Sequence, residues 1–376
     1  MKILAIETSC DETAASILQV EKGRLSVLAH VVSSQVELHA KWGGVVPNLA
    51  AREHVRNIVP VIDEALTKGL CTPDDIDAIA VTEGPGLIPA LLIGTTAAKT
   101  LALVWDKPLI GIHHLEGHIY ANLLAPDTEL RFPLLALIVS GGHTELVLMQ
   151  DHFEYQVLGE TEDDAAGEAF DKVAKMLGLP YPGGSIVERK ARELGITNYE
   201  LGIKFPRPKM DSDDYNFSFS GLKTAVLYFL QKHQPELENK NFVAAVCHEF
   251  QEAVVDVLIG KTERALTEYR PATLVIAGGV SANVRLREQM ENMVQRHPSC
   301  QFLMPPFMYS LDNASMIGAA AALRFSKMNE TEKITLRKNA LSLEPNANLP
   351  LIENMYWKIP PKIKKKTEKN IGQRAM

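Results

Sequence analysis

The sequence predicts an α/β protein built from two lobes of related topology. A strand–turn–strand pattern occurs twice, at residues 2–20 and 134–161, each time as a buried apolar strand, a tight polar turn and a returning strand. Helical patterns lie between these two units and after them. The 376 residues, of which 46% are hydrophobic and 23% charged, have ordinary globular composition and are enough for two domains.

The first half of the chain favours strands followed by helices. Strands are expected at residues 2–9, 12–20 and 26–35, and helices at 50–69 and 87–105. The helix at 87–105 is rich in small residues, so it should pack closely against its neighbours.

The second half is richer in helices. Residues 162–179 carry acidic side chains in their first turn and reach Gly178 at the end, as a capped helix does. Further helices are expected at 185–195, 242–266 and 313–328, and residues 273–290 indicate a strand, a Gly-Gly turn and a helix. We therefore expect a first lobe at 1–112, completed by the C-terminal helix 313–340, and a second lobe with helical insertions at 113–312.

Residues 341–376 are expected to form a basic, poorly structured tail, because Pro, Asn and Lys accumulate there and periodicity fades. The net charge of the chain is −7, yet residues 358–376 hold seven basic side chains and one acidic, a net charge of +6. The remaining body is therefore near −13. A solvated end is the ordinary explanation of such a run, and contact with a polyanion is the alternative.

The four cysteines, Cys10, Cys71, Cys247 and Cys300, are widely spaced and form no CxxC pair, which indicates reduced thiols in a cytosolic protein. No apolar run is expected to reach the length that spans a membrane. The strand that begins at residue 2 leaves no room for a signal peptide. We expect a cytoplasmic protein without a membrane partner.

The stretch HHLEGH, at residues 113–118, holds the first candidate site. His114 and His118 are four residues apart, so on a helix both imidazoles lie on one face, which suits two bonds to one metal ion. Capping or core packing is the alternative role for such a pair. Glu116 would point roughly 160–200° away from both histidines, so it is poorly placed to activate water as in a metallopeptidase.

Asp312, in the stretch YSLDNASMIG, is the candidate third ligand. It lies where a loop enters a helix, so its alternative role is to cap that helix. Two imidazoles and one carboxylate would leave open positions on a divalent metal for oxygen atoms of a substrate.

Several turns at strand ends favour anion or nucleotide binding. In the turn Ser140-Gly141-Gly142, glycines let backbone N–H groups approach an anion, and Thr8-Ser9 occupies the matching turn of the first lobe. The turns at 182–185 and 278–283 each lead into a helix N-terminus. A dinucleotide fingerprint is excluded at 84–89, because Pro89 stands where the third glycine belongs.

Ten motifs occur in an order that resembles the bacterial TsaD type of the universal tRNA threonylcarbamoyladenosine transferases, from residue 1 to about residue 340. These motifs are IETSCDET, GGVVPNLAAREH, EGPGLIPALLIG, HHLEGH, VSGGHTEL, GEAFDKVAKMLGL, YPGG, FSFSGLKT, AGGVSANVRLR and LDNASMIGAAA. The resemblance implies the two-lobed fold of the actin, Hsp70 and sugar-kinase superfamily, with duplicated RNase H-like lobes. Ser310-Leu311 departs from the family, which more often has Cys-Thr before the aspartate.

At matching positions the resemblance implies that His114, His118 and Asp312 bind one divalent metal per subunit, with iron expected and zinc the rival. It also implies contacts to an adenylate substrate from eight residues. These are Ile138, Val139, Ser140, Gly141, Gly142, Asp171, Gly184 and Asn283. Asp171 could instead pair with Lys175 on a helix surface, and Lys223 could meet a phosphate or stay solvated.

The implied reaction transfers the threonylcarbamoyl group from threonylcarbamoyl-AMP to the N6 amine of the adenosine 3′-adjacent to the anticodon in tRNA. The implied protein partners are the inactive paralogue TsaB and the P-loop ATPase TsaE, docking through the small-residue helices of the first lobe. No residue is a convincing general base. Three alternatives remain: a sugar or acetate kinase, a metalloendopeptidase and a non-catalytic scaffold. A kinase of this fold needs no histidine pair for metal. A scaffold has no reason to keep both histidines, Asp312 and Asp171.

Overall fold

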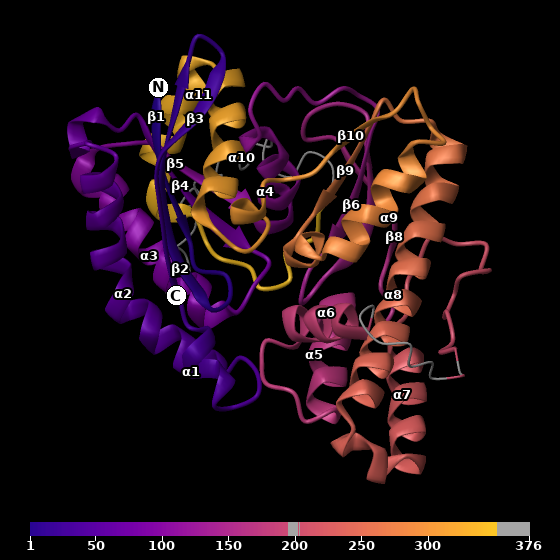
Figure 1. Cartoon of the computed structure of the whole chain (residues 1–376). Helices are drawn as coiled ribbons and strands as arrows, with labels where there is room; N and C mark the ends of the chain where they lie inside the picture. Colours follow the sequence, from indigo (N-terminus) through magenta and orange to yellow (C-terminus); the bar gives the residue numbers. More distant parts are fainter. Residues whose placement is uncertain (195–201, 203, 352–376) are drawn as a thin grey trace, which may run out of the picture.

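The computed structural model describes residues 1–194, 202 and 204–351, and this part of the chain contains two five-stranded sheets (Figure 1). The strands of the first sheet are β1 (Lys2–Glu7), β2 (Glu12–Glu21), β3 (Arg24–Ser34), β4 (Ala78–Gly84) and β5 (Leu109–His113). The strands of the second sheet are β6 (Leu134–Val139), β7 (Thr144–Met149), β8 (Tyr155–Glu160), β9 (Thr273–Ala277) and β10 (Gln301–Leu303).

The two sheets have the same topology. Their strand orders are β3-β2-β1-β4-β5 and β10-β9-β6-β7-β8. In each sheet three consecutive strands pair antiparallel, and two later strands extend the other side in parallel to the first of them. The prediction of an α/β fold with duplicated lobes is therefore confirmed.

Helices cover the sheets and fill the space between them (Figure 1). In the first half they are α1 (Val36–Ala40), α2 (Pro47–Lys68), α3 (Ile88–Trp105) and α4 (His114–Tyr120). In the second half they are α5 (Ala166–Met176), α6 (Gly183–Leu194), α7 (Ser220–Lys232), α8 (Lys240–Tyr269), α9 (Val284–Val294), α10 (Ala314–Lys327) and α11 (Glu330–Lys338).

Three buried cores result from the alternation of side chains along each strand. In β1, Leu4 and Ile6 face the core beneath α2 and α3, whereas Ile3 and Ala5 face a central core. That central core also contains α10, α4 and one face of the second sheet, whose other face packs against α5 to α9. The stretch expected as one C-terminal helix at 313–340 is two helices, α10 and α11, and α10 packs on β1 and β2.

The sequence did not predict β5, β4 or α7, and the last two show why. The strand β4 is fully flanked by β1 and β5, and the single polar side chain that it buries completely, Thr82, donates to the Glu7 carboxylate. At the start of α7, the backbone N–H groups of Phe219 and Ser220 donate hydrogen bonds to the Asp163 carboxylate. Both depend on partners distant in sequence.

The stretch expected to be a tail divides at residue 351. Residues 341–351 pack on the first half of the molecule, where the Leu349 carbonyl accepts from His113 Nε2 at 3.0 Å and Leu351 enters the central core. Burial of these apolar side chains holds the segment in place. Residues 352–376, which hold all seven basic side chains of this stretch, lie outside the described residues.

The helix α3 corrects the expectation about apolar runs. By length and composition it could cross a membrane, with a mean hydropathy of 1.5 over its 18 residues, and it alone meets that test among the described residues. It packs against α2 and β4. Gly94 lies so close to Thr8 of the first turn that a larger residue would clash with the hydroxyl. The helix α3 therefore packs on the first sheet of the fold.

A buried ion pair joins α4 to α10. Glu116 is fully buried, and its Oε1 accepts from Arg324 Nε at 2.6 Å while its second oxygen accepts from the same guanidinium. The guanidinium also lies over the Phe153 ring, 4.2 Å from the centroid. Because a buried charge without its partner is strongly destabilising, this bidentate pair fixes α4 relative to α10.

We expect Glu116→Gln to lower the free energy of unfolding by about 3–5 kcal/mol, because it leaves the Arg324 charge buried and unneutralised. Urea denaturation of the full chain measures this loss. The matched control is Asp106→Asn, which breaks the exposed pair with Arg337 and should cost less than about 1 kcal/mol. Equal losses in the two variants would contradict a structural role for the buried pair.

Candidate metal centre

The candidate ligands meet at the carboxyl edge of the first sheet. Because β1, β4 and β5 are parallel, their carboxyl ends lie at the same edge. Glu7 ends β1, and His113 ends β5 and is followed at once by α4, which carries His114 and His118. Asp312 reaches the same edge from the loop before α10.

His114, His118 and Asp312 lie close enough to share one ion. Asp312 Oδ1 is 3.5 Å from His114 Nε2 and 3.1 Å from His118 Nε2, and one ligand atom from each residue lies within 4.8 Å of the other two. The alternative roles of these residues are taken by their neighbours. His113 Nδ1 accepts from Leu115 N at the start of α4, and Asn313 Oδ1 caps α10.

The chemistry of this group fits a metal ion. His118 is buried, and neither ring nitrogen has a partner in hydrogen-bond geometry within the described part of the chain, although Nε2 lies beside Asp312. A buried polar atom without a partner is costly unless something else binds it. Burial lowers the pKa of His118, which keeps its ring neutral and its lone pair available. The Asp312 side chain is 22% exposed, so the group is open on one side.

Glu7 orients His114. Its Oε2 lies 3.2 Å from His114 Nδ1 and accepts from Thr82 Oγ1 at 2.5 Å, while its Oε1 accepts from Ser9 N. A carboxylate at Nδ1 favours the proton there and leaves Nε2 free to bind metal. Burial opposes protonation of His114, but Asp312 and Glu7 outweigh it and raise the pKa to about 9, so metal binding must displace a proton.

Glu116 takes no part in this group. Its carboxylate points from the opposite face of α4 to Arg324, as the helical spacing predicted. A metallopeptidase needs a carboxylate beside the metal-bound water, and Glu116 is engaged elsewhere.

The turn after β6 lies beside the histidines. His143 lies at the end of this turn, and burial, with the nearby His114 and His118, lowers its pKa to about 4. Ile138 and Val139 are buried in the sheet, and Ser140 Oγ accepts from the backbone N–H groups of Gly142 and His143. Gly141 and Gly142 are exposed, and a side chain at either would meet no atom within 4 Å. The turn therefore presents open backbone.

Asp171 and Gly184 meet at the start of α6. Asp171 Oδ1 accepts from Gly183 N at 2.7 Å, an interaction that replaces the surface pair with Lys175 that the sequence left open. Burial raises the pKa of Asp171, and the nearby Asp11 of the first turn raises it further.

Asn283 and Lys223 are both engaged by protein groups. Asn283 Oδ1 caps α9 by accepting from Leu286 N, and its Nδ2 donates to Gln251 Oε1 at 3.0 Å. A pocket of about 350 Å³ opens beside it, lined by Gln251 and Val284 among others. Lys223 Nζ donates to Asp164 at 2.6 Å. The lysine is therefore paired with a carboxylate rather than held ready for a phosphate.

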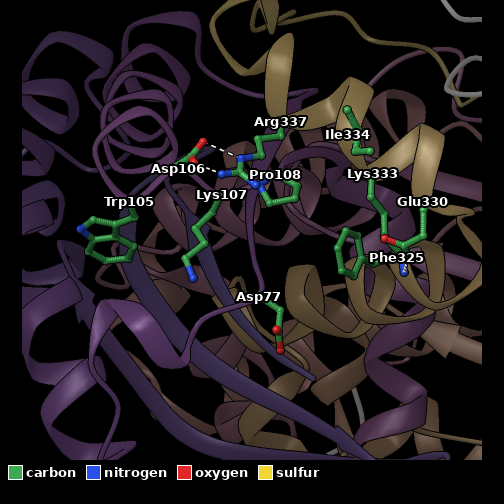
Figure 2. A pocket seen from close by; sticks show the side chains of 10 residues that line it. All are labelled: Asp77, Trp105, Asp106, Lys107, Pro108, Phe325, Glu330, Lys333, Ile334 and Arg337. Carbon is green, nitrogen blue, oxygen red and sulfur yellow. Dashed lines mark hydrogen bonds and ion pairs between the residues drawn. The ribbon is translucent and has the colours of Figure 1, made fainter.

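A pocket of about 490 Å³ lies away from the centre, beside the residues that precede β4 and β5 (Figure 2). Two ion pairs line it: Arg337 pairs with Asp106, and Lys333 with Glu330. This pocket is not the candidate reaction site, because it lies at the amino edge of the sheet, opposite the candidate metal ligands.

Two residues of the centre were missed in the sequence. Glu7 and Ser9, whose Oγ lies 3.1 Å from His114 Nδ1, stand in the IETS motif, which the sequence identified only as a turn. Their contact with His114 joins residues 105 and 107 positions apart. The sequence did hold a signal for Glu7. An acidic residue at the end of an apolar strand is expected to be buried, and a buried carboxylate needs a partner.

A profile of the family described as TsaD: tRNA N6-adenosine threonylcarbamoyltransferase matches residues 26–319. The chain is 50% identical over 331 residues to the tRNA N6-adenosine threonylcarbamoyltransferase of Bacillus subtilis, covering 87% of this chain and 91% of that one. It is 46% identical over 353 residues to the enzyme of the same name from Geobacillus thermodenitrificans, covering 93% and 97%. The solved structure of T. kodakarensis HypF is similar in fold, with TM-score 0.55, 11% identity and coverage of 86% and 48%.

We expect Glu7→Gln to weaken metal binding by about ten- to a hundredfold, because an amide no longer holds the His114 tautomer by charge. Competition with a chromogenic chelator measures the affinity for Zn²⁺ and Fe²⁺. The control is Glu145→Gln, which alters another buried carboxylate in the second sheet and should leave the affinity unchanged. An unaltered affinity in Glu7→Gln would remove its orienting role.

Proposed function

The chain belongs to the TsaD family, the tRNA N6-adenosine threonylcarbamoyltransferases, and on that premise we propose how its residues divide the work. The enzyme transfers a threonylcarbamoyl group to the N6 amine of an adenosine in tRNA. In our proposal the donor is threonylcarbamoyl-AMP and the acceptor is the adenosine 3′-adjacent to the anticodon. The observation that carries the proposal is the convergence of His114, His118 and Asp312 beside an open glycine turn.

The N6 amine is a weak nucleophile because its lone pair is delocalised into the adenine ring. The donor carbonyl must therefore be made more electrophilic and the departing phosphate stabilised. A divalent ion at the centre would supply Lewis acidity toward an oxygen of the donor. His114 and His118 would hold such an ion through Nε2, and Asp312 would neutralise part of its charge, while Glu7 keeps His114 oriented.

Iron is the ion we propose, with zinc as the rival. Two imidazoles and one carboxylate with open positions are the ligand set typical of non-haem Fe(II) sites, and zinc enzymes use similar sets. The donor set supports either ion, and the partial exposure of Asp312 leaves room for a substrate oxygen.

We propose that the adenylate part of the donor lies along the second sheet. The open backbone of Gly141 and Gly142 would meet the phosphate, with Ile138, Val139 and Ser140 holding that turn in place. Asp171 and Gly184 would meet hydroxyl groups at the start of α6, and Asn283 would meet the nucleoside beside its pocket. Each residue acts here by binding or by orienting the donor.

TsaB and TsaE are the protein partners we propose, and α2 and α3 are the docking surface for TsaB. These helices pack side by side and expose apolar side chains at helical spacing. They are Val55 and Val59 on α2, and Ile88, Leu92, Leu103 and Val104 on α3. An exposed apolar patch of this kind is typical of a protein interface.

A cytoplasmic location is part of the proposal. The substrate is tRNA, and the four cysteines are unpaired thiols. Contact between the basic residues 358–376 and tRNA phosphates also remains a proposal, supported by their net charge of +6.

We expect Asp312→Ala to lose metal and at least about a hundredfold of the transfer rate while it stays folded. Transfer is measured by nucleoside composition after incubation with threonylcarbamoyl-AMP, unmodified tRNA and the partner proteins. Asp151→Ala, which removes an exposed carboxylate beyond β7, is the control and should transfer normally. A normal rate in Asp312→Ala would exclude it as a ligand.

We expect Val59→Asp to weaken TsaB binding by about tenfold or more, because a charge would be buried at the interface. Isothermal titration of TsaB into the full chain measures the affinity. Tyr228→Asp, at an exposed position on α7, should bind TsaB as the unaltered chain does. If the unaltered chain, Val59→Asp and Tyr228→Asp bound TsaB with equal affinity, the TsaB interface would lie elsewhere.

A further inference from the structure

The segment that leads to Asp312 exposes three apolar side chains within five residues. It contains a short 3-10 turn, Phe307–Tyr309, and the exposed fractions are 58% for Phe307, 59% for Met308 and 60% for Leu311. Single exposed apolar side chains are ordinary on a protein surface, but such a cluster beside a site indicates a binding surface. We call these three residues the apolar rim.

The Phe307 ring is held firmly although one face is open. The Arg287 guanidinium lies 3.9 Å from the ring centroid. Arg287 is itself buried and donates to the carbonyls of Ser281 and Pro305 and to Ser310 Oγ, at 2.6, 2.9 and 3.0 Å. Because these bonds fix the guanidinium, the ring stacked on it has a fixed position and loses little entropy when a flat ligand covers its other face.

Phe307 lies five residues before Asp312, in a segment that bridges the two sheets. Tyr309 packs edge-on against His30 of β3, with centroids 5.3 Å apart, so the segment spans from the second sheet's helices to the first sheet. Leu311 lies against the Gly279 turn and directly precedes Asp312. Five residues from Phe307 to Asp312 span at most about 17 Å even when extended. A nucleotide next to the reacting one is within this reach.

We propose that the apolar rim is a base-stacking platform for the nucleotides that flank the acceptor adenosine in the anticodon loop. This inference rests on the proposed function. The acceptor base must leave its stack before its N6 amine can reach the centre, and its neighbours then lose their stacking partner. The open face of Phe307 replaces that partner, and the Arg287 guanidinium beneath it completes the stack. Met308 and Leu311 cover the edges of the bases.

The experiment uses the full metal-loaded chain and an unmodified anticodon stem–loop with 2-aminopurine next to the acceptor adenosine. Stacking on the ring quenches the fluorescence of 2-aminopurine. We expect Phe307→Ala to lose the quenching and to weaken binding by about five- to a hundredfold, the range typical of one base on one aromatic ring. Phe307→Trp should restore both. Leu341→Ala, which truncates an apolar residue of the same 58% exposure, should change neither.

The affinities for metal and for threonylcarbamoyl-AMP should be the same in all these variants, because the platform contacts only the tRNA. Unchanged stem–loop binding and quenching in Phe307→Ala would overturn the proposal. So would a variant that loses only the affinity for TsaB or TsaE, since the rim would then be a protein interface. Failure of the proposed donor would look different: the unaltered chain would quench and bind the stem–loop but transfer nothing from threonylcarbamoyl-AMP.

Discussion

The centre depends on parallel strand pairing in the first sheet. Because β1, β4 and β5 run in one direction, Glu7, Gly84 and His113 reach the same edge, and α4 can start there without a connecting loop. His114 is then within 3.2 Å of Glu7, although the two are far apart in sequence. Asp312 completes the group only because α10 packs across the same sheet. The ligand geometry is thus a consequence of the fold.

The short helix α4 separates two electrostatic tasks on two faces. One face carries His114 and His118 toward Asp312, and the other carries Glu116 into its ion pair with Arg324. The ion pair between Glu116 and Arg324 is deeply buried. Rotation of α4 would separate the two charges and leave each without its partner in the core. The ion pair on one face of α4 therefore fixes the orientation of the other face, which carries the candidate metal ligands.

Part of the candidate centre could be predicted because it depends on the spacing of residues close together in the sequence. The pairing of the i, i+4 histidines and the position of Glu116 follow from helical geometry. Asp312 was a candidate because it lies where a loop enters a helix and stands in a family motif. The sheet duplication followed from the repeated strand–turn–strand pattern. What the sequence could not supply were contacts between residues far apart in the chain: Glu7 with His114, Lys223 with Asp164, and Asp171 with the start of α6. The packing of residues 341–351 was missed for the same reason, since a few leucines show no period.

The most direct test of the account is anomalous diffraction from crystals of the full chain loaded with iron. The account predicts one strong peak about 2.0–2.2 Å from His114 Nε2, His118 Nε2 and an oxygen of Asp312, at the carboxyl edge of the first sheet. A peak bound by other residues, or crystals in which these three side chains bind no ion at saturating iron, would contradict it.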